Sequence, residues 1–100
     1  MAATFTEMIS SNKPVLVDFY ADWCGPCRLM QPVLEKLKKT VGNKAAIIKV
    51  DVDKNPHMAN VYGIQGIPTL ILFKNKKALW RQSGVVPLNN LQQIIDQFAG

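Results

Sequence analysis

The spacing of hydrophobic residues changes several times along the chain, and each change predicts a new element. Apolar residues run almost unbroken from Val15 to Tyr20, as in a central strand that is covered on both faces. Between Pro26 and about Val41 they recur at helical intervals instead, and Gly42 is a natural end for that helix. A second strand is predicted from Ala46 to Val52. Two strands joined by a helix normally form a right-handed parallel crossover.

Signals at helix ends predict two further short helices. Thr4 and Glu7 have the spacing of a capping box, so a helix should start there and end before Pro14. Asn55 is a good N-cap and Pro56 suits the first helical position, which predicts another helix. The remaining elements are strands at 69–73 and 79–83, joined by a hairpin of undetermined turn type, and a final helix at 88–98. The order α-β-α-β-α-β-β-α predicts an α/β fold with one mixed sheet and helices on both faces.

Length and composition are those of one globular domain. The chain has 100 residues, of which 48% are hydrophobic and 19% charged. We predict a single domain over residues 1–100 that buries a core without help from metals or disulfides. No apolar run approaches the roughly 20 residues that cross a bilayer, and the first residues lack the basic region and long apolar stretch of a signal peptide. We therefore expect a cytoplasmic monomer without membrane association.

A net charge of +5 raises the question of nucleic-acid binding. Lysines gather in two regions, between residues 36 and 44 and between residues 74 and 77. Few aromatic residues lie among them, and no basic run reaches five residues. Faces that bind nucleic acid usually carry denser basic clusters together with aromatic side chains. The lysines are therefore interpreted as a solvated surface, and no nucleic-acid partner is expected.

Cys24 and Cys27 are the only cysteines, and only Gly25 and Pro26 separate them. A structural zinc site needs four ligands, but the one histidine, His57, has no partner close in sequence, so no metal site is expected. A structural disulfide is also disfavoured, because closing so short a loop restricts the unfolded chain very little. A disulfide that is used for redox chemistry remains.

The position of the two cysteines fits that use. They lie where the first strand ends and a helix begins, so backbone N–H groups and the helix dipole favour a thiolate. Cys24 precedes the helix and should be exposed, whereas Cys27 lies one turn inside it and should point inward. We therefore expect Cys24 to be the attacking nucleophile and Cys27 the resolving thiol. A C-x-x-C pair at a strand–helix junction is a strong signal for a redox site.

Three parts of the chain resemble the thioredoxin family. They are VLVDFYADWCGPC at residues 15–27, GIPT at residues 66–69, and the strand positions Asp18 and Lys49. The similarity runs from about Phe5 to the end of the chain, and WCGPC with a downstream IPT is highly specific. It implies a thioredoxin fold and a thiol–disulfide oxidoreductase that reduces protein disulfides in electron transport and cell redox homeostasis. It also implies that the chain binds no cofactor and is re-reduced by a thioredoxin reductase that draws on NADPH.

The resemblance assigns roles to two charged residues beside the cysteines. Asp18 lies in an apolar strand, where an ionised carboxylate costs several kcal/mol, so burial should raise its pKa. In the family this position is the buried proton acceptor for the resolving cysteine, here Cys27. Lys49 matches its partner on the neighbouring strand, although an exposed residue at a sheet edge is the alternative interpretation.

The resemblance also implies a surface that binds the substrate. Trp23 matches the aromatic residue beside the nucleophile, and Gly25 and Pro26 match the dipeptide of reducing members. Pro68 matches a cis-proline that leaves the backbone of Ile67 free to pair with an incoming chain. The other members of the predicted groove are the loop residues Gly84 and Val85 and an apolar rim of Ile64, Ile67 and Val85.

Some features depart from the family pattern. The initial edge strand is missing or reduced, so we expect a sheet of about four main strands. Lys76 stands where a glycine is usual, and Pro87 where a small capping residue is common. Two other functions stay open: a disulfide oxidase or isomerase, against which Pro26 argues, and a docking module without redox activity. The intact cysteine pair together with Asp18 argues against the docking module.

Overall fold

The computed structural model describes residues 3–99. Within that range the chain forms one mixed sheet of four strands in the order β2-β1-β3-β4. The strands are β1 (Val15–Tyr20), β2 (Ala46–Asp51), β3 (Thr69–Lys74) and β4 (Lys77–Ser83). β1 runs parallel to β2 and antiparallel to β3, which in turn is antiparallel to β4. The predicted sheet of about four main strands is therefore confirmed for residues 3–99.

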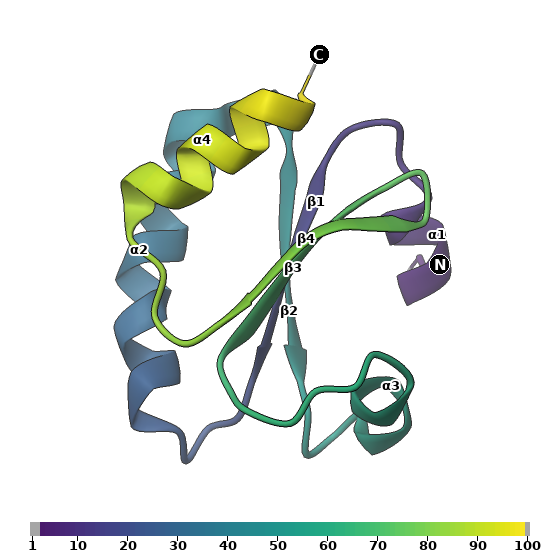
Figure 1. Ribbon diagram of the computed structural model, residues 1–100, viewed down its shortest axis with the longest axis vertical. Coiled ribbons are helices and arrows are strands. Elements are labelled where there is room, and N and C mark those ends of the chain that lie inside the picture. The colour runs from purple at the N-terminus through teal and green to yellow at the C-terminus, as the bar shows by residue number, and fades with distance from the viewer. Residues whose placement is uncertain (1–2, 100) are drawn as a thin grey trace.

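Helices cover both faces of the sheet, as predicted (Figure 1). α2 (Gly25–Val41) and α4 (Leu88–Phe98) contact each other on one face. α1 (Phe5–Ile9) and α3 (Pro56–Val61) lie on the opposite face, and a 3-10 turn, η1 (Gly42–Lys44), follows α2. No helix among the described residues is long and apolar enough to cross a membrane.

The alternation of strand side chains divides the core into two clusters. One cluster lies under α2 and α4 and includes Leu16, Leu70, Leu72, Met30, Leu34, Leu37, Leu91 and Ile95. The other lies under α1 and α3 and includes Ile9, Val15, Val17, Phe19, Val50, Ile71 and Phe73. Strands β1 and β3 are buried on both faces, which explains their nearly continuous apolar sequences.

The ends of two helices differ in detail from the prediction. α2 begins at Gly25 rather than Pro26, because Cys24 itself is the N-cap and its Sγ accepts the Cys27 N–H at 3.2 Å. Asn55 precedes α3 as predicted, but its side chain makes no capping hydrogen bond and instead donates to the carbonyl of Asp51 at 2.9 Å. The predicted cap at Thr4 is confirmed, since its hydroxyl accepts the N–H of Glu7 at 3.1 Å.

The hairpin between β3 and β4 is a tight turn of two residues, Asn75 and Lys76, with φ of 53° and 69°. Positive φ at both positions is typical of the two-residue hairpin turn whose twist matches that of the flanking strands. Because the turn has only two residues, β4 starts at Lys77, two residues earlier than predicted. The turn also contacts the segment after α1. The N–H of Asn75 donates to the carbonyl of Ser11 at 2.9 Å, and the N–H of Lys76 donates to that of Ile9 at 2.8 Å.

Candidate active site

Cys24 and Cys27 form a disulfide, with their Cα atoms 5.2 Å apart, where β1 leads into α2. The predicted difference in exposure is wrong for this disulfide form, because Cys24 is 4% exposed and Cys27 2%. Both sulfurs pack into a small cluster with Ala21 and Ile67. Sequence position placed Cys24 outside the helix, but it could not show that the loop before Pro68 covers the sulfur.

The first turn of α2 stabilises negative charge on Cys24. Its Sγ accepts the N–H of Cys27 at 3.2 Å and therefore lies at the positive end of a helix of 17 residues. In the reduced protein the same N–H group and the same dipole would favour a thiolate at this sulfur. The role of Cys24 as the nucleophile stays a prediction.

Asp18 is fully buried in the middle of β1, on the face that α2 covers. Neither of its carboxylate oxygens has a hydrogen-bond partner. Burial raises the pKa of Asp18 from 3.8 to about 6, and the positive charge of Lys49 offsets part of this rise. The predicted rise in pKa is confirmed, and it places the titration of Asp18 close to neutral pH.

Lys49 is the neighbour of Asp18 in the β1–β2 register, but it lies on an edge strand and its side chain is exposed. Its Nζ stands 4.3 Å from the centroid of the Tyr20 ring, which is a cation–π contact. Both interpretations of Lys49 that the sequence left open therefore hold. It is an exposed edge residue, and its charge still lowers the pKa of Asp18.

The predicted substrate groove adjoins Cys24. The carbonyl of Ile67 lies 3.7 Å from the Cys24 sulfur, and the peptide bond between Ile67 and Pro68 is cis, as the resemblance implied. The N–H of Gly84 donates to the carbonyl of Pro68 at 2.8 Å, so the two predicted loops lie together. Val85, next along the chain, is 45% exposed.

The other predicted groove residues differ in their exposure. Trp23 is 69% exposed, and Gly25 and Pro26 are exposed at the start of α2. Ile64 is half-buried and packs against the cluster under α1 and α3. Ile67 is half-buried against the cysteines. Trp23, Gly25, Pro26 and Val85 therefore offer the exposed surface, whereas Ile64 and Ile67 line it only in part.

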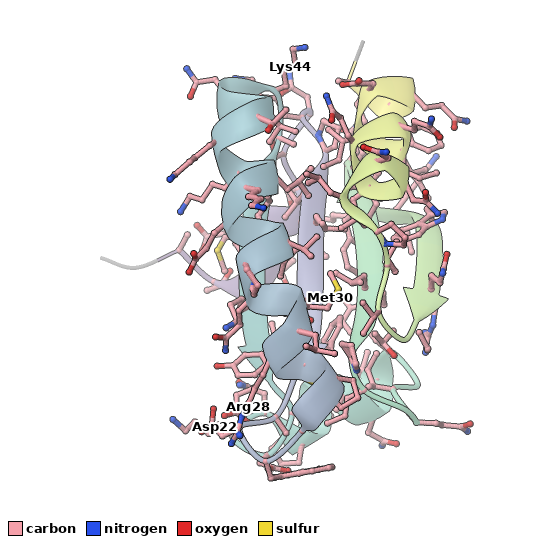
Figure 2. The ribbon with its side chains drawn as sticks, turned by 90° about the vertical axis from the view of Figure 1, so that its left-hand side faces the viewer. Asp22, Arg28, Met30 and Lys44 are labelled. Atoms are coloured by element: carbon pink, nitrogen blue, oxygen red, sulfur yellow. A yellow bond between two sulfur atoms is a disulfide. The ribbon has the colours of Figure 1, made fainter. Side chains whose placement is uncertain are left out.

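Sequence reasoning missed two hydrogen bonds that hold the surroundings of Cys24. The indole Nε1 of Trp23 donates to Asp53 Oδ2 at 2.8 Å, and the guanidinium of Arg28 donates to the carbonyl of Asp22 at 3.0 Å. Figure 2 shows Asp22 and Arg28 together at the end of the molecule where α2 begins. The bond to Asp53 could have been suspected from the sequence, because Trp23 follows β1 and Asp53 follows β2. The carboxyl ends of two parallel strands lie at the same edge of a sheet.

Sequence reasoning also missed Met30, which lies one turn beyond Cys27 and is fully buried between α2 and its neighbours (Figure 2). Its thioether sulfur accepts the N–H of Val86 at 3.3 Å. Together with the bond from Gly84 to Pro68, this contact holds the loop on both sides of Val85. A hydrophobic residue in a helix stripe gave no signal for this use of its sulfur.

A disulfide lies at a helix N-terminus, a buried carboxyl group lies on the strand that leads to it, and a cis peptide bond adjoins it, an arrangement that suits thiol–disulfide exchange. Among residues 3–99 no three His, Cys, Asp or Glu side chains are grouped as for a metal ion. The sequence profile of the family described as Thioredoxin matches residues 1–97. The chain belongs to the thioredoxin family.

Individual relatives agree with this assignment. A thioredoxin of Chlorobaculum thiosulfatiphilum is 44% identical over 95 residues, which are 95% of this chain and 88% of the relative. The chloroplastic thioredoxin Y of Oryza sativa subsp. japonica is 45% identical over 95 residues. The chain spans only 56% of that protein and of the chloroplastic thioredoxin Y2 of Arabidopsis thaliana. A mutant thioredoxin from Halobacterium salinarum NRC-1 superimposes with a TM-score of 0.87 at 39% identity, covering 95% of this chain and 82% of that one.

Proposed function

We propose that this chain reduces disulfide bonds in partner proteins through Cys24 and Cys27. The observation that carries the proposal is the disulfide at the start of α2, with the Cys24 sulfur 3.7 Å from the carbonyl of Ile67. An extended partner that pairs with the backbone of Ile67 would bring its own disulfide to Cys24. Trp23, Gly25, Pro26, Ile64, Pro68, Gly84 and Val85 would bind the partner around it.

The reaction proceeds by two thiol–disulfide exchanges. The Cys24 thiolate attacks one sulfur of the partner disulfide, that S–S bond breaks, and the other partner sulfur leaves as a thiolate that takes up a proton. Cys27 then attacks the Cys24 sulfur, the mixed disulfide breaks, and the second partner thiol is released. The partner gains two electrons and two protons, and the chain ends as the Cys24–Cys27 disulfide.

Asp18 accepts the proton that Cys27 loses in the second exchange. With a pKa of about 6 the carboxyl group is mostly ionised at neutral pH, so it can act as a base. The Lys49 charge lowers the pKa of Asp18 and thereby keeps this base available. Lys49 therefore acts on Cys27 only through Asp18, which is too buried to contact a docked partner.

An NADPH-dependent thioredoxin reductase would return the disulfide to the dithiol. The chain itself would work without a bound cofactor, as a monomer in the reducing environment of the cytoplasm. The test is reduction of insulin disulfides in the presence of NADPH and a thioredoxin reductase, followed by NADPH absorbance and insulin precipitation. We expect turnover that is lost when Cys24 and Cys27 are both changed to serine.

Two outcomes would replace the proposal. A reduction potential close to about −180 mV, rather than the value of about −270 mV typical of thioredoxins, would indicate an isomerase or oxidase. If the variant with both cysteines changed to serine kept its biological function, the chain would be a docking module.

A further inference from the structure

The two edges of the sheet differ in character. β4 forms one edge, and nearly all of its side chains are exposed, including Lys77 and Arg81. β2 forms the other edge and carries two half-buried isoleucines, Ile47 and Ile48, with Lys49 as its one exposed charged side chain. Charged residues on an edge strand discourage pairing with another chain, so an edge with fewer of them and more apolar side chains pairs more readily. β2 is therefore the edge on which an additional strand is more readily accepted.

The backbone groups that would take part can be identified. The N–H of Ala46 donates to the carbonyl of Pro14 at 3.0 Å, and the N–H of Val52 donates to that of Tyr20 at 2.8 Å. Since successive residues of a strand face opposite sides, the even-numbered residues of β2 bond to β1. The backbones of Ile47 and Lys49 therefore point away from the sheet, and within residues 3–99 β1 is the only strand that pairs with β2.

A hollow of about 240 Å³ lies between this edge and α2. It is lined by Gln31, Leu34, Glu35 and Lys38 of α2 and by Ile47 and Lys49 of β2. The two residues whose backbone is free therefore also line the hollow. A strand added to β2 would place alternate side chains over Leu34 and Ile47, because paired residues share a face of the sheet.

The charges around the hollow indicate which side chains an added strand would place in it. Lys38 and Lys49 line it together with one acidic residue, Glu35. Lys44 is exposed just before β2 begins, at the end of the molecule opposite Asp22 (Figure 2). A glutamate can cover Leu34 with its methylene groups while its carboxylate reaches a lysine. A second copy of this chain would bring the same lysines against each other, which is unfavourable.

We propose that the free edge of β2 binds an extended segment of another protein in which acidic and apolar residues alternate. The backbone of the segment pairs with Ile47 and Lys49, its acidic side chains enter the hollow beside Lys38, and its apolar side chains lie on the face of Ile48. This surface uses neither cysteine, so binding does not depend on disulfide reduction and is measured with the disulfide form.

The probe is a capped peptide of alternating glutamate and valine, titrated into the isotope-labelled protein at low salt and followed by amide NMR. We expect saturable shifts that centre on Ile47 and Lys49. A peptide with lysine in place of glutamate should bind on the order of tenfold more weakly. A glutamate–valine peptide that is N-methylated at alternate residues keeps the charge and cannot pair, so it should give no saturable shift.

A pair of protein variants separates the hollow from general charge attraction. Lys38→Glu and Lys39→Glu change the net charge equally, and both side chains are exposed on α2, but only Lys38 lines the hollow. We expect Lys38→Glu to weaken the glutamate peptide on the order of tenfold and to improve binding of the lysine peptide. Lys39→Glu should change either affinity by less than about twofold. Insulin reduction should be the same in both variants.

Four results would overturn the proposal. They are equal effects of the two variants, no saturable shift with the glutamate peptide, shifts that centre on Trp23 and Ile67 instead, and dimerisation of the chain through Ile47 in the absence of peptide. The third result would place the peptide in the substrate groove, and the fourth would make a second copy the occupant. Each can be distinguished from a failure of the redox function, which the insulin assay measures separately.

Discussion

Replacing Asp18 with asparagine removes a buried ionisable group and keeps the size and shape of the side chain. In the wild-type protein both carboxylate oxygens are buried without a hydrogen-bond partner. Protonated aspartic acid and asparagine are both neutral and polar, so their burial costs are similar. The difference in stability between the two proteins therefore reports the cost of the buried charge.

The raised pKa gives the size of this cost. A rise from 3.8 to about 6 corresponds to about 3 kcal/mol, since each pKa unit is worth about 1.4 kcal/mol. Below pH 3.8 the folded and unfolded chains both hold the proton, and the cost is absent. Between pH 3.8 and about 6 the unfolded chain releases the proton while the folded chain keeps it, so stability is lost as the pH rises. Above about pH 6 both forms are ionised and the full cost remains.

We therefore expect Asp18→Asn to be more stable than wild type by about 3 kcal/mol at neutral pH and of similar stability below pH 3.8. Urea denaturation of the disulfide form at several pH values measures the difference directly. Because all other titrating groups are the same in the two proteins, subtraction isolates Asp18. A difference that does not change with pH, or a variant that is less stable at neutral pH, would refute the reasoning.

The same substitution should slow the reaction. Asparagine cannot accept the proton of Cys27, so release of the mixed disulfide should become slower, by roughly the 10²-fold to 10⁴-fold that a general base contributes. Single-turnover reduction of insulin at neutral pH measures this step. Stability and activity should thus move in opposite directions. If the activity were unchanged, Asp18 would have no part in proton transfer.

Three further predictions concern other parts of the chain. Cys27→Ser should trap a mixed disulfide with protein substrates on Cys24, whereas Cys24→Ser should trap little; adducts found mainly on Cys27 would reverse the assignment. Lys76→Gly should raise the free energy of unfolding by about 1 kcal/mol, because φ of 69° is strained for lysine; an unchanged urea midpoint would contradict this. Met30→Leu leaves the buried N–H of Val86 without its acceptor. Amide exchange at Val86 should therefore become faster, and KM for insulin should rise several-fold with little change in kcat. Equal changes for a small disulfide reagent would argue against a role of Met30 in the substrate groove.

The parts of the fold that follow from local pattern could be predicted from the sequence. β1 is buried on both faces, so its apolar residues are continuous in the sequence. α2 is buried on one face, so its apolar residues recur at helical spacing, and the two patterns can be told apart. The raised pKa of Asp18 follows from the same apolar run. The start of β4 was missed because the turn at Asn75 and Lys76 lacks the glycine by which such turns are usually recognised.

Contacts between distant segments could not be predicted in this way. Cys24 is buried by the loop before Pro68, whose position depends on how β3 packs against β1. The bond from Trp23 to Asp53 joins residues 30 positions apart, and that from Val86 to Met30 joins residues 56 apart. Each of these side chains has several possible partners in the sequence, and only the packed tertiary structure selects one.

The turn at Asn75 and Lys76 bears on how the chain can be engineered. Hairpin tips on the surface are normally the places where an affinity tag, a fluorophore loop or a new terminus is tolerated. Here the two N–H groups of the turn hold the carbonyls of Ser11 and Ile9, so an insertion would also release the connection between α1 and β1. The connection between α3 and β3 is an alternative site for an insertion. An insertion there has to leave Ile67 in place, because its carbonyl lies beside the Cys24 sulfur. α4 ends at Phe98, at the opposite end of the molecule from the start of α2 (Figure 1), so a fusion partner attached there lies away from the disulfide and leaves the hairpin intact.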